Sequence, residues 1–284
     1  MTAAAPGTPD AMADPTPPAA TTPSSTRPLA LVTGASSAIG LELARQFATG
    51  GFDLVVTAED AGLAGAAASL RTDGGGEVLA VQADLRAREG VERVWAAVQE
   101  RGRPLEAAAL NAGIGLGRSF VDQDLDEALA VVDLNVRSTT HLAHLVLRDM
   151  VARDQGRVLF TSSIAATMPG ANQAVYNATK SYVQSLAEAL QAELSGTAVT
   201  VTSLMPGPTA TAFFERGRLA DTPIGQGPKD DPADVARQGF EALMAGKHRV
   251  VAASLMTRAM ELSNKVLPDR VKAAANKVMA KPLG

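Results

Sequence analysis

The feature that most constrains the fold is a repeated alternation of short apolar runs with longer amphipathic segments. Runs of this length predict strands, and the segments between them predict helices. Because the runs are apolar throughout, both faces of each strand are expected to be buried, as in a parallel sheet covered by helices. Right-handed crossovers then give one doubly wound, Rossmann-like α/β domain. The expected strands cover residues 29–32, 52–57, 78–82, 107–110, 158–161, 199–204 and 249–252.

Composition divides the 284 residues into three parts. Residues 1–27 are mostly Ala, Pro, Thr and Ser, which cannot bury enough surface to offset their ordering entropy, so we predict a disordered tail. Residues 28–253 hold the strand–helix alternation and form the expected main domain. Residues 254–284 combine helical spacing of apolar residues with an excess of Lys and Arg, which predicts a basic amphipathic helical extension.

Charge and cysteine content exclude several classes of function. A net charge of −4 and a pI near 5.5 do not give the basic field that nucleic-acid binding needs. The chain has no cysteine, which excludes disulfides, thiolate catalysis and Cys-based zinc sites. Its three histidines lack a convincing set of carboxylate partners, and we predict no metal site. We expect a cytoplasmic protein, because we find neither a secretory signal pattern nor an apolar run of about 18 residues.

A glycine-rich turn, TGASSAIG, joins the first expected strand to an amphipathic segment that ends near Gly50. Glycines allow the backbone to approach a pyrophosphate, and a helix N-terminus offers N–H donors at the positive end of its dipole. Ligands of doubly wound sheets bind at the carboxyl ends of strands, where this turn lies. The turn therefore indicates a dinucleotide site, with an ordinary tight strand-to-helix connection as the alternative.

Tyr176 and Lys180 are the side chains that point most directly to chemistry. Their i, i+4 spacing places the phenol and the ammonium on one face of an expected helix, and Ser163 stands before them at the end of a strand. A phenol has a pKa of about 10, and a nearby cation favours its ionised form. Lowering that pKa to about 7 requires roughly 4 kcal/mol, which this ammonium and a second positive charge in a dry site could supply. The alternative is a surface pair with a solvated charge.

A set of motifs follows in a fixed order: TGASSAIG, Asp84, Asn111-Ala112-Gly113, Asn135, Ser163, YNATK at 176–180 and PGPTAT at 206–211. In order, spacing and expected structural context, the set resembles the short-chain dehydrogenase/reductase family. The resemblance implies an oxidoreductase that transfers a hydride between NAD(P) and a secondary alcohol or ketone. It also implies a substrate lid at about 209–232, and a homodimer or homotetramer formed through the long expected helix 125–152 and the Tyr176–Lys180 helix.

The resemblance implies a role for each matching position. Tyr176 is the expected general acid–base, Lys180 binds the nicotinamide ribose and lowers the Tyr176 pKa, and Ser163 orients the substrate oxygen. Asn135 is expected to hold a water that links Lys180 to solvent. The expected cofactor-binding residues are Gly34, Ser36, Ile39, Gly40, Glu59, Asp84, Leu85, Asn111, Ala112, Gly113, Tyr176, Lys180, Pro206, Gly207, Thr209 and Thr211.

Two positions depart from the family pattern. Ala38 stands where the family usually has the middle glycine of the turn, and its methyl group is expected to press slightly on the pyrophosphate. Leu110 replaces the first asparagine of the usual Asn-Asn-Ala-Gly. Neither change removes a catalytic atom, so we expect activity. The glycines of 113–117 are not followed at once by a helix, and we interpret that segment as a flexible rim of the site.

The choice of cofactor is expected at the end of the second strand. A carboxylate there accepts from the ribose hydroxyls and repels a 2′-phosphate. Glu59 falls near the position where NADP-using members often carry arginine, and the glycine turn contains no Lys or Arg. We therefore favour NAD over NADP. The alternative is that Glu59 and Asp60 are acids of a helix's first turn, where the dipole stabilises them.

The C-terminal third leaves two alternatives open. Phe213 and Phe214 either face the substrate or pack the lid onto the body. The extension 254–284 either covers the body or a partner subunit, which we favour, or lies on an anionic membrane. Asp231 and Pro232 predict the start of a helix between the lid and the last strand.

Three functions compete at this point. The leading one is hydride transfer by a Ser-Tyr-Lys-Asn mechanism. A catalytically silent nucleotide sensor or scaffold would keep the fold without turnover, which the presence of Ser163, Tyr176, Lys180 and Asn135 argues against. A membrane-associated reductase of a lipid-like carbonyl rests only on the extension. The sequence does not define the substrate, because substrate pockets are built from loops.

Overall fold

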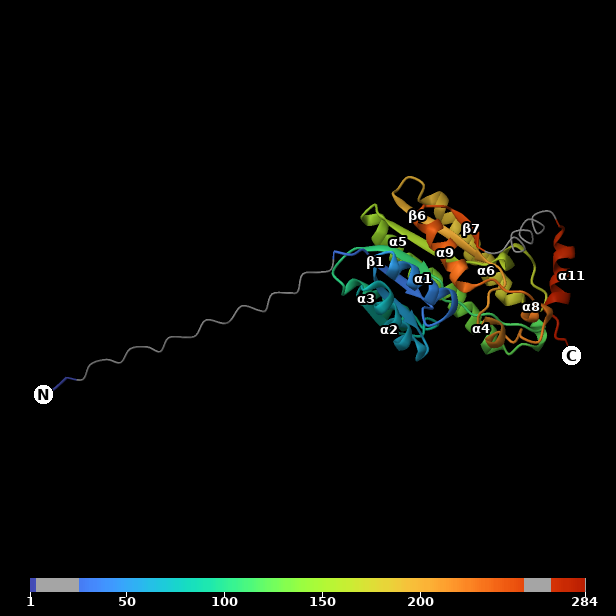
Figure 1. The fold of residues 1–284 in the computed structure, drawn as a ribbon, viewed down its shortest axis with the longest axis horizontal. Helices are drawn as coiled ribbons and strands as arrows, with labels where there is room; N and C mark the ends of the chain where they lie inside the picture. Colours follow the sequence, from blue (N-terminus) through green and yellow to red (C-terminus); the bar gives the residue numbers. More distant parts are fainter. Residues whose placement is uncertain (4–25, 253–266, 284) are drawn as a thin grey trace.

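The computed structural model describes residues 1–3, 26–252 and 267–283 and shows a seven-stranded parallel sheet between two helical layers (Figure 1). The strand order is β3-β2-β1-β4-β5-β6-β7, so the chain builds one half of the sheet outward from β1 and then the other half from β4. This order confirms the predicted doubly wound fold. The strands are β1 (Leu29–Thr33), β2 (Asp53–Ala58), β3 (Val78–Gln82), β4 (Leu105–Leu110), β5 (Gly156–Thr161), β6 (Val199–Pro206) and β7 (Arg249–Ala252).

The two helical layers explain why the strands are apolar on both faces. One layer contains α1 (Ala38–Thr49), α2 (Gly62–Gly74) and α9 (Pro232–Met244), and the other contains α3 (Arg88–Gln99), α5 (Thr139–Ala152) and α6 (Ala174–Glu193). Consecutive residues of a strand point to opposite faces. Leu31 accordingly packs toward α3, α5 and α6, and Val32 toward α1, α2 and α9.

Shorter elements lie at the carboxyl edge of the sheet and around it. Asp231 accepts from the N–H of Ala233 at 2.8 Å and so caps α9, which confirms the predicted helix start. The short elements are η1 (Phe120–Asp122), α4 (Leu125–Val132), η2 (Asp133–Ser138), η3 (Ile164–Thr167), α7 (Phe213–Arg216), α8 (Pro223–Gln226) and α11 (Asp269–Met279).

The long helix predicted for residues 125–152 is not continuous. Its middle turn, η2, is a π-helical turn that separates α4 from α5 and contains Asn135. π-Helical turns are rare, and they occur frequently at functional sites. The periodicity of the apolar residues did not reveal this interruption.

The N-terminal boundary differs slightly from the prediction. Arg27 was assigned to the tail, but its guanidinium donates to the carbonyl oxygens of Gly51 at 3.2 Å and Gly74 at 2.9 Å. Arg27 therefore belongs to the folded body. Most of the predicted tail, residues 4–25, lies outside the described residues, as does the part of the C-terminal extension from 254 to 266.

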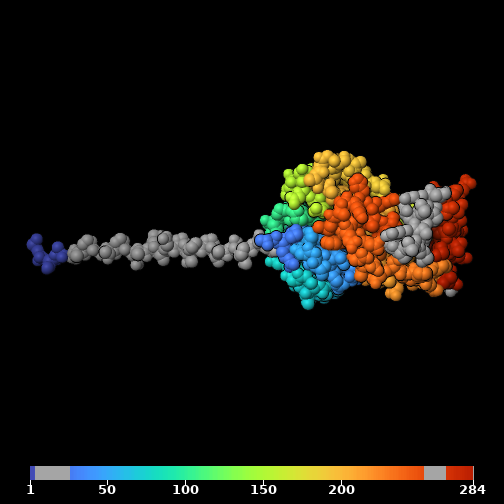
Figure 2. Space-filling model, turned by 45° about the horizontal axis from the view of Figure 1, so that its top comes forward, coloured from blue at the N-terminus to red at the C-terminus, as the bar shows by residue number. Residues whose placement is uncertain are grey.

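The described end of the extension, residues 267–283, stands at the end of the body that also carries the lid (Figures 1 and 2). Its helix α11 lies beside α8 of the lid. Over the ranges 1–3, 26–252 and 267–283, none of the helices has the length and apolar character that crossing a bilayer requires.

Candidate active site

One continuous cavity of about 430 Å³ lies along the carboxyl ends of the strands. Its wall contains Ser163, Tyr176, Lys180 and every cofactor position expected from the sequence. Asn135 is the exception among the expected site residues, because it lies behind the wall and is 1% exposed. The reversal of strand order between β1 and β4 is the place where such sheets bind ligands, and the cavity lies there.

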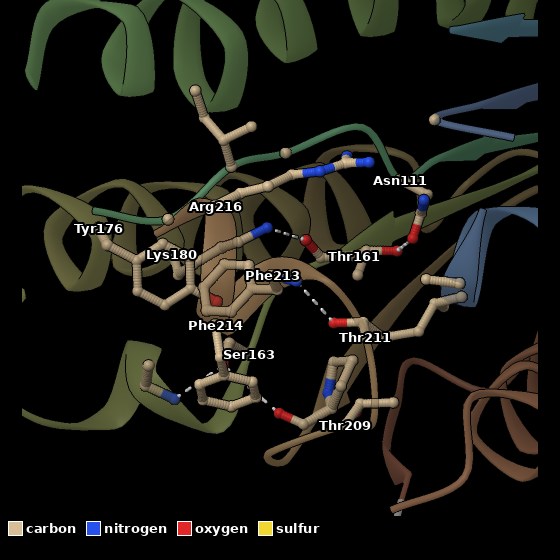
Figure 3. A pocket seen from close by; sticks show the side chains of 18 of the residues that line it. Asn111, Thr161, Ser163, Tyr176, Lys180, Thr209, Thr211, Phe213, Phe214 and Arg216 are labelled. Carbon is tan, nitrogen blue, oxygen red and sulfur yellow. Dashed lines mark hydrogen bonds between the residues drawn. The ribbon is translucent and has the colours of Figure 1, made fainter. Parts of the chain in front are cut away.

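Tyr176, Ser163 and Lys180 lie near one another in the wall of this cavity (Figure 3). The phenol of Tyr176 lies beside the Ser163 hydroxyl, which acts to lower the pKa of the phenol, and both residues are 8% exposed. Lys180 lies one turn further along α6, where its Nζ donates to the carbonyl oxygen of Thr161 at 2.8 Å. The same Nζ is 6.0 Å from the centre of the Tyr176 ring.

Burial changes the proton affinity of both titratable groups. The loss of hydration raises the pKa of Tyr176 to about 12, while the Ser163 hydrogen bond acts in the opposite direction. Burial also lowers the pKa of Lys180 to about 8. In the protein alone the net shift of the Tyr176 pKa is therefore upward, and the lowering expected from Lys180 together with a second positive charge stays a prediction. Desolvation is the larger effect on the phenol, and the ammonium of Lys180 donates to the carbonyl of Thr161.

Asn135 holds the loop that follows β4. Its side chain accepts from the N–H of Ile114 at 2.9 Å, and donates to the carbonyl of Ile114 at 2.9 Å and the hydroxyl of Thr179 at 3.0 Å. Gly113 fits between Asn135 and Lys180, because an added Cβ would lie 3.1 Å from the Asn135 Oδ1 and 3.2 Å from the Lys180 Nζ. Asn135 thus fixes the loop against which the lysine packs.

The glycine turn joins β1 to α1 in a conformation that requires two of its glycines. Gly34 has a φ of +69°, and a Cβ added at Gly40 would lie 2.0 Å from the Gly34 carbonyl oxygen. Ala38 also has a positive φ, of 54°. A left-handed conformation costs an L-residue roughly 1–2 kcal/mol. The alanine that replaces the family's glycine at position 38 therefore strains the backbone of the turn.

Acidic side chains surround the far end of the cavity, where β2 and β3 end. Asp60 accepts from the Ser36 hydroxyl at 2.6 Å and from the N–H of Gly62 at 2.9 Å. Glu59 accepts from the guanidinium of Arg86 at 2.9 Å. Arg86 also pairs with Asp84, and its hydrogen bond lowers the pKa of the Asp84 carboxyl. Three acids and one arginine therefore face this end.

Asn111, at the end of β4, makes the hydrogen bonds that join the strand ends at the centre of the cavity. Its backbone N–H donates to the Thr33 hydroxyl at 2.9 Å, and its Oδ1 accepts from the Thr161 hydroxyl at 3.0 Å. Asn111 therefore ties together the ends of β1, β4 and β5. Leu110, which replaces the family's asparagine, is 4% exposed and belongs to the core behind the cavity.

The two phenylalanines of the lid were expected either to face the substrate or to pack the lid onto the body. Phe213 packs on Tyr176, with ring centres 5.1 Å apart, so it lies at the Ser163-Tyr176-Lys180 end of the cavity. Phe214 is 6% exposed and also packs the lid, in a cluster with Leu219 and Ala280. Both rings contribute to the cavity wall.

The lid packs against the segment 113–117. A Cβ added at Gly115 would lie 2.2 Å from the Phe213 Cζ, and one added at Gly117 would lie 2.6 Å from the Leu219 Cδ2. The N–H of Gly117 also donates to the carbonyl of Gly217 at 2.7 Å. The interpretation of this segment as a flexible rim is incomplete, because Gly115 and Gly117 each make room for a defined lid contact.

Several wall residues were not predicted from the sequence. Asp60, beside Glu59, is one of them, and Arg86, which pairs with the wall residues Glu59 and Asp84, lies behind the wall. Arg216 ends α7, and Figure 3 shows its side chain extended across the cavity in this view. The residues of α11 gave no signal, because they reach the cavity only through long-range packing. The unpredicted wall residues of the C-terminal segment are Leu267, Lys272, Ala275, Asn276 and Met279.

The cavity fits a nicotinamide dinucleotide. A glycine turn at a helix N-terminus can receive a pyrophosphate, and acidic groups that can accept from ribose hydroxyls lie at one end of the wall. The Ser163-Tyr176-Lys180 set lies at the other end. Within the described ranges, no group of three or more His, Cys, Asp or Glu side chains could hold a metal ion.

Comparisons with known proteins agree with this geometry. Residues 28–221 match the sequence pattern of the short chain dehydrogenase family. The NADP-dependent 3-hydroxy acid dehydrogenase YdfG of Salmonella typhi is 31% identical over 192 residues, which are 67% of this chain and 76% of that protein. The chain therefore belongs to the short-chain dehydrogenase/reductase family and is an NAD(P)-dependent dehydrogenase.

Two solved structures show the same fold. The short-chain dehydrogenase from Sphingobium yanoikuyae in complex with NADPH is 28% identical, with a TM-score of 0.75 over 84% of this chain and 93% of that one. A short chain dehydrogenase/reductase from Burkholderia phymatum in complex with NAD is 23% identical, with a TM-score of 0.76 over 91% and 98% of the two chains. The two neighbours thus carry different cofactors.

Proposed function

We propose that the protein interconverts a ketone and a secondary alcohol, with Tyr176 as the group that donates or removes the proton. The observation that carries the proposal is the buried contact of the Tyr176 phenol with Ser163, beside Lys180, in the wall of a cavity fit for a dinucleotide. The bound nicotinamide supplies or accepts the hydride. The raised pKa keeps Tyr176 protonated at neutral pH, which is the form that ketone reduction requires.

Ser163 and Lys180 assist in different ways. The Ser163 hydroxyl donates to the carbonyl of Pro206 at 3.4 Å, a long bond that it can exchange for a bond to the substrate oxygen. The Lys180 ammonium favours the phenolate that forms when Tyr176 gives up its proton. Its hydrogen bond to Thr161 keeps it at the cavity wall, where the ribose hydroxyls of the cofactor would meet it.

Asn135 serves this mechanism by holding Lys180 in place and giving it a route to solvent. Both ends of its side chain are bonded to Ile114 and Thr179, so the water of the proton relay is proposed to bind a backbone carbonyl of the η2 turn. A π-helical turn shifts the hydrogen bonding of the helix and can release such a carbonyl.

We propose that NAD is the preferred cofactor. Glu59, Asp60 and Asp84 face the adenosine end with Arg86, and Arg86 is already bonded to two of them. The excess negative charge disfavours a 2′-phosphate. Replacing Glu59 with Gln removes one of these charges and leaves Arg86 freer to bind a phosphate. We expect Glu59→Gln to tighten NADPH binding about tenfold and to leave NADH binding within twofold, measured by cofactor fluorescence titration.

A second copy of the chain is the proposed protein partner. Leu125, Leu129 and Val132 follow one face of α4 and are 68%, 48% and 37% exposed, and Tyr182 on α6 is 40% exposed. Apolar side chains in such a stripe favour contact with another subunit. Light scattering of the wild type and of Leu125→Glu/Leu129→Glu tests this: the variant is expected to have a smaller mass.

The function itself is tested with a panel of small ketones and secondary alcohols, followed at the absorbance of the reduced nicotinamide with NADH and NADPH in parallel. Turnover of at least one ketone with NADH, and less with NADPH, is the expected result. Tight NADH binding without turnover across the panel would favour the silent nucleotide sensor. Nothing about the described part of the extension favours the membrane-associated alternative, because the inner face of α11 lines the cavity.

A further inference from the structure

The helix α11 is fastened to the segment that carries the catalytic serine. Asn276 is 7% exposed, and its Nδ2 donates to the carbonyl of Ala171 at 2.8 Å. The Nζ of Lys272 donates to the carbonyl of Thr167 at 3.2 Å. Thr167 and Ala171 both lie between Ser163 and the start of α6, so α11 packs against the wall of the active site.

The end of the chain is fastened to the lid on the other side. The N–H of Leu283 donates to the carbonyl of Asp221 at 2.8 Å. Ala280 is fully buried in a cluster with Phe214 and Leu219 of the lid. The C-terminal segment therefore bridges the two sides of the substrate end of the cavity.

One face of α11 is turned into this end. Lys272, Ala275, Asn276 and Met279 line the cavity, and their spacing of i, i+3, i+4 and i+7 is that of a single helical face. Met279 is 41% exposed although it lines the cavity, so its side chain is available to a ligand. Val278, its neighbour in sequence, is 66% exposed and lies outside the cavity wall.

The wall around α11 is mostly apolar. Among the described residues, the acids that line the cavity are Glu59, Asp60 and Asp84, all at the adenosine end. The substrate end has Arg216, and Lys272 is bonded to Thr167 and paired with Asp269. The apolar side chains that line the substrate end are Met168, Phe213, Phe214, Ile224, Leu267 and Met279.

α11 lies beyond the residues that match the family pattern. The match to the family pattern ends at residue 221, and α11 begins at Asp269. The family pattern therefore does not specify the substrate wall that α11 contributes.

We infer that α11 is the outer wall of the substrate compartment and selects a ketone or secondary alcohol with a long apolar substituent. The substrate oxygen meets Ser163 and Tyr176, and the apolar substituent extends past Phe213 to Ala275 and Met279. This inference rests on the proposed function for the reaction, but the compartment itself can be tested without turnover. Each buried methylene improves binding about fourfold, so chain length is the sharpest variable.

Two tryptophan variants on adjacent residues separate the wall from the rest of α11. Ala275→Trp places a large side chain in the cavity wall, and Ala274→Trp places the same side chain at an exposed neighbouring position outside it. The first measurement is binding of N-phenyl-1-naphthylamine, an uncharged apolar fluorophore. We expect Ala275→Trp to weaken its binding at least fivefold relative to wild type, and Ala274→Trp to leave it within twofold. Equal binding by both variants, or no binding to the wild type, contradicts the inference.

The second measurement compares reduction of 2-butanone and 2-nonanone with NADH. The wild type is expected to have the higher kcat/KM for 2-nonanone, and Ala275→Trp to lower that value at least tenfold. Its kcat/KM for 2-butanone and its Kd for NADH are expected to stay within twofold. Equal losses for both ketones contradict a role in selectivity. If the fluorophore result holds and the wild type reduces neither ketone, the compartment is supported and the proposed reaction fails.

Discussion

The two ends of the cavity are lined by different kinds of residue. The cofactor end consists of backbone and short side chains from β1, β2, β3 and β4, which lie close together in the first 113 residues. The substrate end consists of large side chains from α6, the lid and α11, which come from segments far apart in the chain. The cofactor end is therefore defined by local motifs, and the substrate end by long-range packing. The predictions below probe that division.

The largest expected effect is at the cofactor end. Gly40→Ala places a Cβ 2.0 Å from the backbone oxygen of Gly34, and a backbone atom cannot move aside as a side chain can. We expect a stability loss of more than about 3 kcal/mol or at least a hundredfold weaker NADH binding, by denaturant titration and fluorescence. Gly65→Ala is the matched control. Nothing lies within 4 Å of a Cβ there, and the helix is expected to gain up to about 1 kcal/mol.

Lys180 lies where the two ends meet, and its replacement is expected to stabilise the protein while abolishing turnover. Burial lowers its pKa from 10.5 to about 8, a destabilising shift. At about 1.4 kcal/mol per pKa unit, and allowing for the lost bond to Thr161, Lys180→Met is expected to gain about 2 kcal/mol at pH 7.

The advantage of Lys180→Met depends on pH. Between the folded pKa of about 8 and the unfolded value of 10.5, the unfolded wild type binds more protons than the folded one. The wild type therefore recovers stability as the pH rises through this range, and the gap between the two proteins shrinks. Urea titrations at pH 7 and pH 10 measure the gap, and a gap that widens with pH contradicts the assignment.

A smaller effect is expected at the substrate end. Gly115→Ala brings a Cβ within 2.2 Å of the Phe213 ring, which can swing away because it is a side chain. We expect a stability loss of about 1–2 kcal/mol and a tenfold lower kcat/KM, with the NADH Kd within twofold. Gly196→Ala, where nothing lies within 4 Å of the new Cβ, is expected to match the wild type in both assays. A large change in the NADH Kd of Gly115→Ala would remove the separation between the two ends.

The smallest effect is expected at Ala38. Its φ of 54° costs roughly 1–2 kcal/mol, and glycine relieves that strain while adding entropy to the unfolded chain. Ala38→Gly is therefore expected to raise stability by about 0.5 kcal/mol, seen as a small increase in Tm by calorimetry. A loss of stability would mean that the methyl group makes a favourable contact that outweighs the strain.

The division also explains what the sequence could predict. The strand pattern predicted the sheet, because the central strands are buried on both faces by the two layers of helices. Most of the site residues could be located because they lie at the carboxyl end of a predicted strand or in the first turns of the helix that follows it, whereas Asn135 was identified from the family resemblance alone. The direction of the Tyr176 pKa shift could not, because desolvation depends on the surrounding fold. The role of Ala275 and Met279 also needed coordinates, since their contacts lie more than 50 residues away in the chain.

The central claim is that the cofactor binds at one end of the cavity and that Tyr176 transfers the proton at the other end. Replacing Tyr176 with Phe removes the hydroxyl that meets Ser163 and leaves the ring against Phe213. The most direct test measures kcat for ketone reduction and the NADH Kd of Tyr176→Phe on the same preparation. The account predicts a kcat at least about a thousandfold lower with the Kd within twofold. A variant that reduces the ketone at a rate near wild type would contradict it.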